Sequence, residues 1–342
     1  MTELNPNLNC VVSVIVPLYN AAATITATLD SIVATETSGL EIIIVDDGSK
    51  DEGWDAVVSF QQSHPYTKIV LERHSGNANL GASKTRNYAA TLATGQYLAF
   101  LDADDLYHAH RFTDSIAMLD ADPELAAVFG TFKYLVDGES TDGQVREIRK
   151  ELDWDDSDFP TEQEMPFLTQ QLNGKSGLHT STVTLRRDVF RELGGFPNLK
   201  YVDDQALWLR LFATEHAARV TGPHLSLYRI HNNSWCSGGE QSLEFLFGPV
   251  LSRMNAIAWL KSNHPNCDGI HEIRQNLPGK LFHRYFSVAD KDKSARLFMF
   301  RLMLKSAKLH PAILTDRRFW SILIRLFIRR RVTVSESSNP SA

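Results

Sequence analysis

The first hundred residues alternate continuous apolar runs with amphipathic stretches. Four runs have the length and β-branched content of buried strands: residues 11–17, 41–45, 67–72 and 96–101. Three stretches between them carry apolar side chains at helical spacing: residues 22–34, 54–62 and 82–94. Gly95 is expected to cap the third helix at its C-terminus. Apolar strands alternating with helices predict an α/β fold whose central sheet is mostly parallel and flanked by helices.

Beyond residue 105 the alternation is looser. Three further strands are expected at residues 125–132, 179–185 and 226–231. Three helices are expected at residues 111–120, 186–193 and 203–214. The polar, acidic stretch 137–159 predicts an exposed insertion, and from about residue 240 the pattern is helical.

Polar side chains follow the predicted strands at their carboxyl ends. Asn20 follows the first strand, Asp46 and Asp47 the second, and Asp102 and Asp104 the fourth. In a parallel sheet these ends meet at one edge, where open α/β sheets bind their ligands. The sequence therefore predicts a ligand site at this edge.

Two of these acidic segments each have two interpretations. Asp102 and Asp104 can both turn toward Mg²⁺ or Mn²⁺, which prefer oxygen ligands. A helix N-terminus would also favour acids here, and Asp105 alone suits that interpretation. The DDGS sequence at 46–49 is either a plain turn or the source of a carboxylate that accepts hydrogen bonds from a base or ribose.

Later segments add three candidate groups. Arg86 lies near the start of the third helix, where it either faces solvent or contacts a nucleotide diphosphate. The chain has neither a GxxxxGK[ST] P-loop nor a GxGxxG motif after a strand. Asp203 and Asp204 begin a helix, either as capping residues or as a general base at a cleft. His231 ends a strand, either as an ordinary hydrogen-bonded histidine or as a neutral metal ligand.

Composition and charge exclude several classes of protein. The 342 residues, 43% of them hydrophobic, are enough to bury a sizeable core. Three distant cysteines argue against a disulfide framework, and the N-terminus lacks a secretory pattern, so we expect a cytoplasmic protein. Residues 291–331 carry +10, which leaves −16 elsewhere because the total is −6. An acidic body with a basic end is not typical of a nucleic-acid-binding protein.

Seven segments, taken in order, resemble the bacterial-type family-2 glycosyltransferases with the GT-A fold. They are SVIVPLYNAA, IIIVDDGSKD, NLGASKTRN, GQYLAFLDADD, RRDVFRELGGF, VDDQALWLR and YRIHNNS, within residues 11–234. The resemblance implies inverting transfer of a sugar from a nucleotide diphosphate, by preference uridine diphosphate (UDP). The acceptor would be a hydroxyl of a saccharide or lipid-linked saccharide in surface polysaccharide assembly. Without a QxxRW motif, the implied reaction is non-processive.

The resemblance also implies a domain organisation and a role for each matching residue. We expect a GT-A domain at 10–235, with a nucleotide-binding half at 10–105 and an acceptor half at 106–235, then a helical region at 236–332 and a flexible tail at 333–342. The implied nucleotide-binding residues are Pro17, Tyr19, Asn20, Asp47, Arg86, Asp102 and Ala103. The implied ligands of Mn²⁺ or Mg²⁺ are Asp104, Asp102 and His231. Asp204 is the implied general base, beside Asp203, which replaces the usual Glu of the family.

Two other classes compete with this interpretation. A sugar nucleotidyltransferase would carry a glycine-rich, basic loop after the first strand, where this chain has PLYNAAATI. A catalytically inactive sugar-nucleotide-binding protein would be expected to lose the DxD sequence or the acid pair, and this chain keeps both.

The segment from Arg317 to Arg331, RRFWSILIRLFIRRR, combines an apolar face with six arginines and no acid. Such a basic amphipathic helix suits an anionic membrane interface. It also suits a helix that packs on the protein with its arginines directed outward. We expect the membrane contact, with the protein peripheral on the inner face of the cell membrane; the sequence does not indicate an oligomeric state.

Overall fold

A computed structural model of the protein describes residues 10–136, 166–174, 178–214, 216–220, 224–230, 242–288 and 293–327. The predicted insertion at 137–159, His231 and the predicted tail at 333–342 lie outside these residues. The described residues up to Ile273 form one compact unit (unit 1), and those from Arg274 form a second (unit 2). Unit 1 includes residues beyond 235. The predicted boundary between the GT-A domain and the helical region, at residues 235 and 236, stays a prediction.

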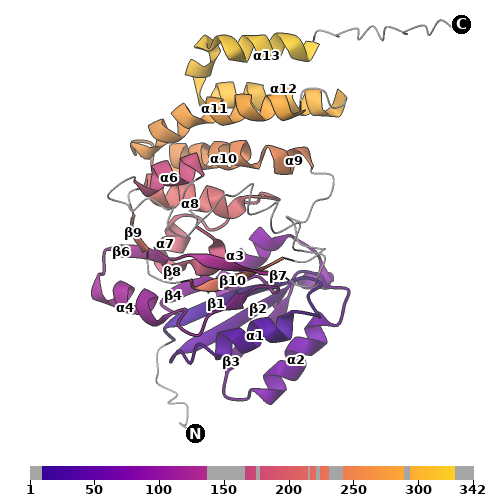
Figure 1. The fold of residues 1–342 in the computed structure, drawn as a ribbon, viewed down its shortest axis with the longest axis vertical. Helices are drawn as coiled ribbons and strands as arrows, with labels where there is room; N and C mark the ends of the chain where they lie inside the picture. Colours follow the sequence, from indigo (N-terminus) through magenta and orange to yellow (C-terminus); the bar gives the residue numbers. More distant parts are fainter. Residues whose placement is uncertain are drawn as a thin grey trace, which may run out of the picture. The chain divides into compact units, whose positions relative to one another are not determined.

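A seven-stranded sheet forms the centre of unit 1 (Figure 1), in the order β3-β2-β1-β4-β8-β6-β9. Its strands are β1 (Val12–Leu18), β2 (Leu40–Asp46), β3 (Lys68–Arg73), β4 (Tyr97–Phe100), β6 (Leu125–Phe129), β8 (Thr184–Arg186) and β9 (Ala217–Val220). The first four pair in parallel, as predicted. β8 runs antiparallel to both of its neighbours, so the sheet as a whole is mixed.

Helices cover both faces of this sheet (Figure 1). The connecting helices are α1 (Ile25–Val33), α2 (Gly53–Ser63) and α3 (Ala82–Leu92), with a short 3₁₀ turn, η1 (Ser75–Asn77), before α3. From β1 to β3 the chain steps across the sheet in one direction, and it then returns to place β4 on the other side of β1. Because such crossovers are right-handed, α1 and α2 share one face and α3 lies on the other.

The first two strands are apolar on both sides because both sides are covered. Val14 and Val16 of β1 belong to the core on the α1–α2 face, whereas the alternate residue Ile15 points to the other face. All three side chains are fully buried, and each such burial contributes about 2 kcal/mol. Leu119 of α4 (Thr113–Ala121) completes the same core.

A second, three-stranded sheet has the order β5-β10-β7. Its strands are β5 (Leu106–Tyr107), β10 (Ser226–Ile230) and β7 (Phe132–Val136). The strand predicted at 125–132 ends earlier, as β6 at Phe129, and its last residue, Phe132, begins β7 in the other sheet. The strand predicted at 179–185 begins instead as a 3₁₀ turn, η3 (Thr180–Thr182), because the His179 side chain accepts a hydrogen bond from the amide of Ser181.

Gly95 does not cap α3 as predicted. The helix ends at Leu92, and Gly95 lies against the start of β1. A Cβ atom at Gly95 would lie 2.6 Å from the Oγ atom of Ser13, so this close approach of two backbones requires glycine.

The remaining described elements are helical, as predicted for the C-terminal region. Unit 1 also contains α6 (Phe167–Asn173), α7 (Arg187–Glu192), α8 (Asp203–Ala213), α9 (Leu243–Leu246) and α10 (Gly248–Asn263). α11 spans Gly269–Val288, and unit 2 continues with α12 (Lys293–Leu309), the 3₁₀ turn η4 (Pro311–Thr315) and α13 (Arg317–Phe327). Within the described ranges, no helix combines the length and apolar character needed to cross a bilayer.

Candidate active site

Asn20 joins the loop after β1 to the loop after β2. Its backbone amide donates to Ser49 Oγ at 3.1 Å, and its side-chain oxygen accepts from the amide of Lys50 at 2.8 Å. Asn20 has φ 48°, a left-handed conformation that asparagine tolerates better than most residues. Beside it, Pro17 is half-buried within β1 and Tyr19 is 51% exposed. The edge of the sheet therefore presents an accessible aromatic ring.

The DDGS loop is built around two acids with different partners. Asp46 accepts a hydrogen bond from the amide of Ser49 at 2.9 Å, which gives it a structural role in the turn. Asp47 accepts from the amides of Leu80 at 2.6 Å and Gly81 at 3.0 Å, so it fixes the segment that leads into α3. Both carboxylates are almost fully buried.

The acidic segment after β4 is held by its backbone. The carbonyl oxygen of Ala103 accepts hydrogen bonds from Thr24 Oγ1 at 2.9 Å and from Thr28 Oγ1 at 3.0 Å. The carbonyl oxygen of Asp104 accepts from Arg229 Nε at 2.7 Å. These contacts from α1 and β10 fix the position of the segment, while the side chains of Asp102 and Asp104 remain partly exposed.

Asp105 is not a helix cap, because the next helix begins only at Thr113. Its side chain is fully buried and accepts a hydrogen bond from the amide of Arg229 at 2.9 Å. Burial, together with the charges of Asp104 and Asp102, raises the pKa of Asp105 well above its usual value and favours the protonated acid. The capping interpretation of Asp105 is therefore wrong: it anchors β10 to the acidic segment.

Arg86 connects the acidic segment to the acid pair of α8. Its side chain is buried; Nη2 donates to Asp102 Oδ1, and Nη1 donates to Asp203 Oδ2 at 3.3 Å. Burial alone would raise the pKa of Asp102, but the guanidinium lowers it below its usual value. The buried guanidinium of Arg86 thus connects Asp102 to Asp203, two residues far apart in the chain. We call this pair of contacts the Arg86 bridge.

The two acids of the pair have different partners. Asp203 accepts hydrogen bonds from Arg86 Nη1 and from Ser83 Oγ, the second at 2.8 Å. Asp204 accepts from Thr180 Oγ1 at 3.1 Å and from the amide of Gln205 at 2.7 Å. Burial raises the pKa of both carboxyl groups.

The backbone immediately before the acid pair is strained. Val202 has φ 53°, a left-handed conformation that is unfavourable for a β-branched side chain. Its side chain lies close to Gly248 at the start of α10, where an added Cβ atom would come within 3.0 Å of Val202 Cγ2. The packing of α10 therefore supports the conformation from which α8 and both acids begin.

His179 is a site residue that the sequence did not single out. Its ring centroid lies 4.7 Å from that of Phe132 and 5.0 Å from that of Tyr228, and the next residue, Thr180, contacts Asp204. Burial lowers the pKa of His179 to about 4, so its imidazole is neutral near neutral pH. A lone histidine in an apparent strand carries no sequence signal for this position.

The described residues fit a divalent cation only in part. Among them, no group of three or more His, Cys, Asp or Glu side chains is gathered as a metal site. Asp102 and Asp104 offer two partly exposed carboxylates on one segment. Such a pair suits Mg²⁺ or Mn²⁺, which commonly complete their coordination with water and substrate phosphates.

Comparisons with known proteins identify the family and the fold. A family model described as "Glycosyl transferase family 2" matches residues 13–194. An Escherichia coli UDP-Glc:alpha-D-GlcNAc-diphosphoundecaprenol beta-1,3-glucosyltransferase, WfaP, is 28% identical over 225 residues, 65% of this chain and 78% of that protein. An uncharacterized glycosyltransferase of Haemophilus influenzae is 25% identical over 308 residues, 85% of this chain and 94% of that protein.

Two solved structures share the fold at low identity. Residues 1–349 of TarS from S. aureus, in complex with UDP-GlcNAc, superpose with a TM-score of 0.66 at 17% identity, covering 92% of this chain and 88% of TarS. The mannosyltransferase PcManGT from Pyrobaculum calidifontis, with GDP-Man and Mn²⁺, gives a TM-score of 0.52 at 19% identity, covering 92% and 85%. These likenesses confirm the GT-A fold. Because the family model also spans more than half of the chain, the protein is a member of glycosyltransferase family 2.

Proposed function

We propose that the protein transfers a sugar from a UDP-sugar to a hydroxyl group of a lipid-linked saccharide, with inversion at the anomeric carbon and with a divalent cation. The Arg86 bridge carries this proposal, because it sets the acidic segment after β4 beside the acid pair of α8. A donor site and an acceptor base must be neighbours in such a reaction. Support for the donor and acceptor comes from the name of WfaP and from the UDP-GlcNAc complex of TarS.

On the donor side, Asp104, Asp102 and His231 would hold the cation. Pro17, Tyr19, Asn20, Asp47, Arg86 and Ala103 would line the nucleotide site with them. The cation, when bound, offsets negative charge on the departing diphosphate. The backbone contacts of Ala103 and Asp104 hold the acidic segment in place, and the side chains of Asp102 and Asp104 stay partly exposed.

On the acceptor side, Asp204 would take the proton from the attacking hydroxyl. The hydroxyl oxygen forms the new bond to the anomeric carbon while the bond to the diphosphate breaks, and attack from the opposite face inverts the configuration. A carboxylate with a raised pKa is the better base for a hydroxyl. Asp203, held by Arg86 and Ser83, would position the pair.

Binding of nucleotide sugars tests the donor and metal assignments. We expect UDP-glucose or UDP-N-acetylglucosamine to bind more tightly with Mn²⁺ than with a chelator. Asp104→Asn should weaken binding about tenfold or more, because a carboxylate ligand is lost. Asp114→Asn, which changes an exposed acid on α4, is the matched control. Binding that ignores both Mn²⁺ and Asp104 would refute the metal assignment, and selective binding of GDP-mannose would refute the UDP assignment.

Aromatic side chains beside the acid pair would receive the acceptor sugar. The register of β7 and β10 pairs Phe132 with Ser226 and Tyr134 with Tyr228, so these four side chains share one face of the small sheet. His179 contacts that face, and Ser181 of η3 hydrogen-bonds Ser226 at 2.7 Å. His179 and the next residue, Thr180, connect these half-buried rings to Asp204, and the rings offer a surface on which the apolar face of a sugar ring would stack.

Tyr228→Ala is expected to raise the KM for the acceptor about tenfold, because a stacking surface for the sugar ring is lost. Hydrolysis of the bound donor by water should stay within about threefold of the wild-type rate. Initial rates measured at varied acceptor concentration, with Tyr228→Phe as the control that keeps the ring, provide the test. An unchanged acceptor KM would remove Tyr228 from the acceptor site. A fall in the rate of donor hydrolysis as large as the rise in the acceptor KM would indicate a structural role for Tyr228 instead.

We also propose that the enzyme works at an anionic membrane surface, on the inner face of the cell membrane. The acceptor named for WfaP carries diphosphoundecaprenol, a lipid. An enzyme that uses such an acceptor must meet it where the lipid is anchored.

A further inference from the structure

Helix α13 has two apolar faces, and the fold uses only one of them. Phe319, Ile322 and Leu326 are buried, with exposed fractions of 1%, 2% and 9%. Trp320 and Ile324, four residues apart and therefore on one side of the helix, are 47% and 54% exposed. The second face therefore adds little to the core of unit 2.

The exposed side continues onto the turn before the helix. Trp320 Nε1 donates a hydrogen bond to the carbonyl oxygen of Leu314 at 2.7 Å, which ties the indole to η4. Leu314 is itself 41% exposed. We call Leu314, Trp320 and Ile324 the outer apolar face; it is a preformed surface, since the indole is fixed by this bond.

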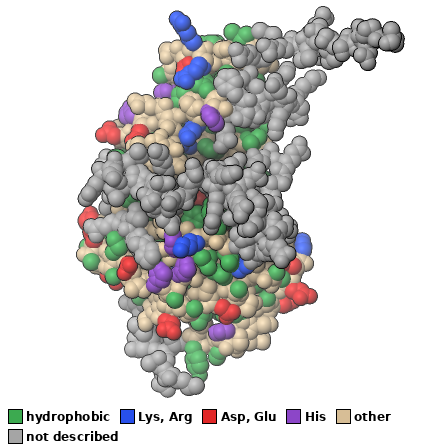
Figure 2. Space-filling model, viewed as in Figure 1, with side chains coloured by type: hydrophobic (Ala, Val, Ile, Leu, Met, Phe, Trp, Pro, Cys, Tyr) green, Lys and Arg blue, Asp and Glu red, His purple; other side chains and the backbone are tan. Residues whose placement is uncertain are grey.

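The part of the chain that carries this face is strongly basic in sequence. From residue 274 to residue 342 the chain has 15 Lys and Arg against four Asp and Glu, a balance of +11, whereas the rest of the chain carries −17. Arg317 is exposed at the start of α13, and Arg318 pairs with Asp316 at 2.7 Å. Figure 2 shows basic and hydrophobic side chains close together at the surface in the region of α13.

We propose that the outer apolar face docks on an anionic lipid bilayer, with Trp320 and Ile324 inserted at the level of the headgroups. Tryptophan favours the membrane–water interface, and each Lys or Arg close to an anionic surface adds attraction. The described part of α13 has 11 residues, which is too few to span a bilayer, so we place this part on the surface. The contact deepens the proposed function by bringing the enzyme to a lipid-linked acceptor, but it does not require the proposed reaction.

A second protein surface is the less suitable occupant. A stable protein interface takes roughly 20–30 residues from each partner, whereas the outer apolar face consists of three among the side chains that the structure describes. A bilayer needs no such shape complementarity, since a few inserted side chains and a diffuse positive charge are enough.

Flotation of the full chain with lipid vesicles tests the proposal without any sugar donor. The wild type should float with vesicles of phosphatidylglycerol and phosphatidylcholine and stay unbound with phosphatidylcholine alone. The double variant Trp320→Ser, Ile324→Ser should lower the partition coefficient about tenfold or more. Arg317→Glu should lower it about tenfold through charge alone. Tyr66→Ser, which removes a 73% exposed aromatic ring from unit 1, is the control and should float like the wild type.

Specific outcomes would overturn the proposal. They are failure of the wild type to float with anionic vesicles, equal flotation with neutral vesicles, or flotation of the double variant at the wild-type level. A further one is a concentration-dependent dimer, seen by analytical ultracentrifugation, that the double variant abolishes, because the face would then be a self-association surface. Far-UV circular dichroism of each variant separates loss of binding from loss of fold.

Discussion

Asp204→Asn is expected to lower the kcat for sugar transfer by about 10²–10⁴-fold while changing the Kd of the donor by less than about threefold. The amide keeps the shape of the side chain. Its oxygen can still accept from the amide of Gln205, and its nitrogen can donate to Thr180 Oγ1, but it cannot accept the proton of the acceptor hydroxyl. Single-turnover transfer rates and donor titration of the same preparations measure the two quantities separately.

Asp203→Asn is the matched comparison, because it changes the neighbouring acid in the same way. Asp203 holds Arg86, and Arg86 holds Asp102. We therefore expect this variant to weaken donor binding more than Asp204→Asn does. It should lower kcat less. The opposite order would assign the general base to Asp203.

The pH dependence of transfer gives a second readout of the same assignment. Burial raises the pKa of Asp204, so its carboxylate is lost by protonation at a higher pH than an ordinary aspartate would be. Transfer should fall as the pH drops through this raised pKa, and Asp204→Asn should remove that acid limb from its residual rate. An unchanged acid limb in the variant would mean that another group is titrating.

The parallel half of the sheet could be predicted because its physical cause is local. β1 and β2 are covered on both faces, so most of their side chains are apolar, and the observed bounds differ from the predicted ones by one residue at each end. The acids that follow the strands could be placed at one edge for the same reason.

The connections between distant segments could not be predicted in this way. Arg86 and Asp203 are 117 positions apart, and neither residue type reveals its partner. His179 appeared to belong to a strand because its neighbours are β-branched, whereas its side chain closes a local turn. Asp105 resembled a cap, although its partner is a backbone amide in β10.

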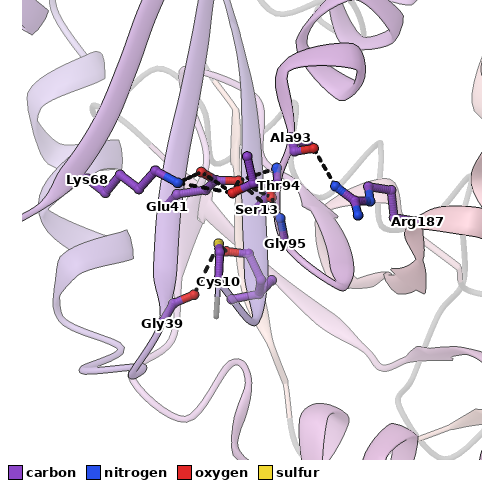
Figure 3. A network of polar contacts seen from close by, with 10 residues as sticks. Cys10, Ser13, Gly39, Glu41, Lys68, Ala93, Thr94, Gly95 and Arg187 are labelled. Atoms are coloured by element: carbon purple, nitrogen blue, oxygen red, sulfur yellow. Dashed lines mark hydrogen bonds and ion pairs between the residues drawn. The ribbon is translucent and has the colours of Figure 1, made fainter. Parts of the chain in front are cut away.

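Glu41 is a further case in which sequence position conceals a structural role. It appeared as an ordinary polar residue at the start of β2, yet its carboxylate is fully buried at the end of the strand opposite Asp46. Figure 3 shows its polar contacts. It accepts hydrogen bonds from Ser13 Oγ at 2.6 Å, from the amides of Thr94 at 2.6 Å and Gly95 at 3.2 Å, and it pairs with Lys68 Nζ at 2.6 Å. One side chain thus joins three neighbouring strands and the loop before β4.

Glu41→Gln is expected to lower the free energy of unfolding of unit 1 by about 3–5 kcal/mol. The amide nitrogen of glutamine would face donors that need an acceptor, and Lys68 would lose its charged partner. Lys68→Met is the control. Lys68 is 53% exposed, so removing its ammonium group should cost no more than about 1 kcal/mol. Urea denaturation followed by tryptophan fluorescence measures the free energy of unfolding of both variants. Equal losses of this free energy would show that the exposed ion pair, not the buried hydrogen bonds, stabilises this end of β2.

The stability contributed by Glu41 should also depend on pH in a defined window. Burial opposes ionisation, but the hydrogen bonds from Lys68, Ser13 and Thr94 outweigh it and lower the pKa of Glu41 from 4.5 to about 2. Since the folded form has the lower pKa, the stabilisation is present above pH 4.5 and is lost as the pH falls from there toward about 2. Its size is at most about 3 kcal/mol. The difference in unfolding free energy between wild type and Glu41→Gln should therefore shrink across that window, and a constant difference would mean that Glu41 does not titrate there.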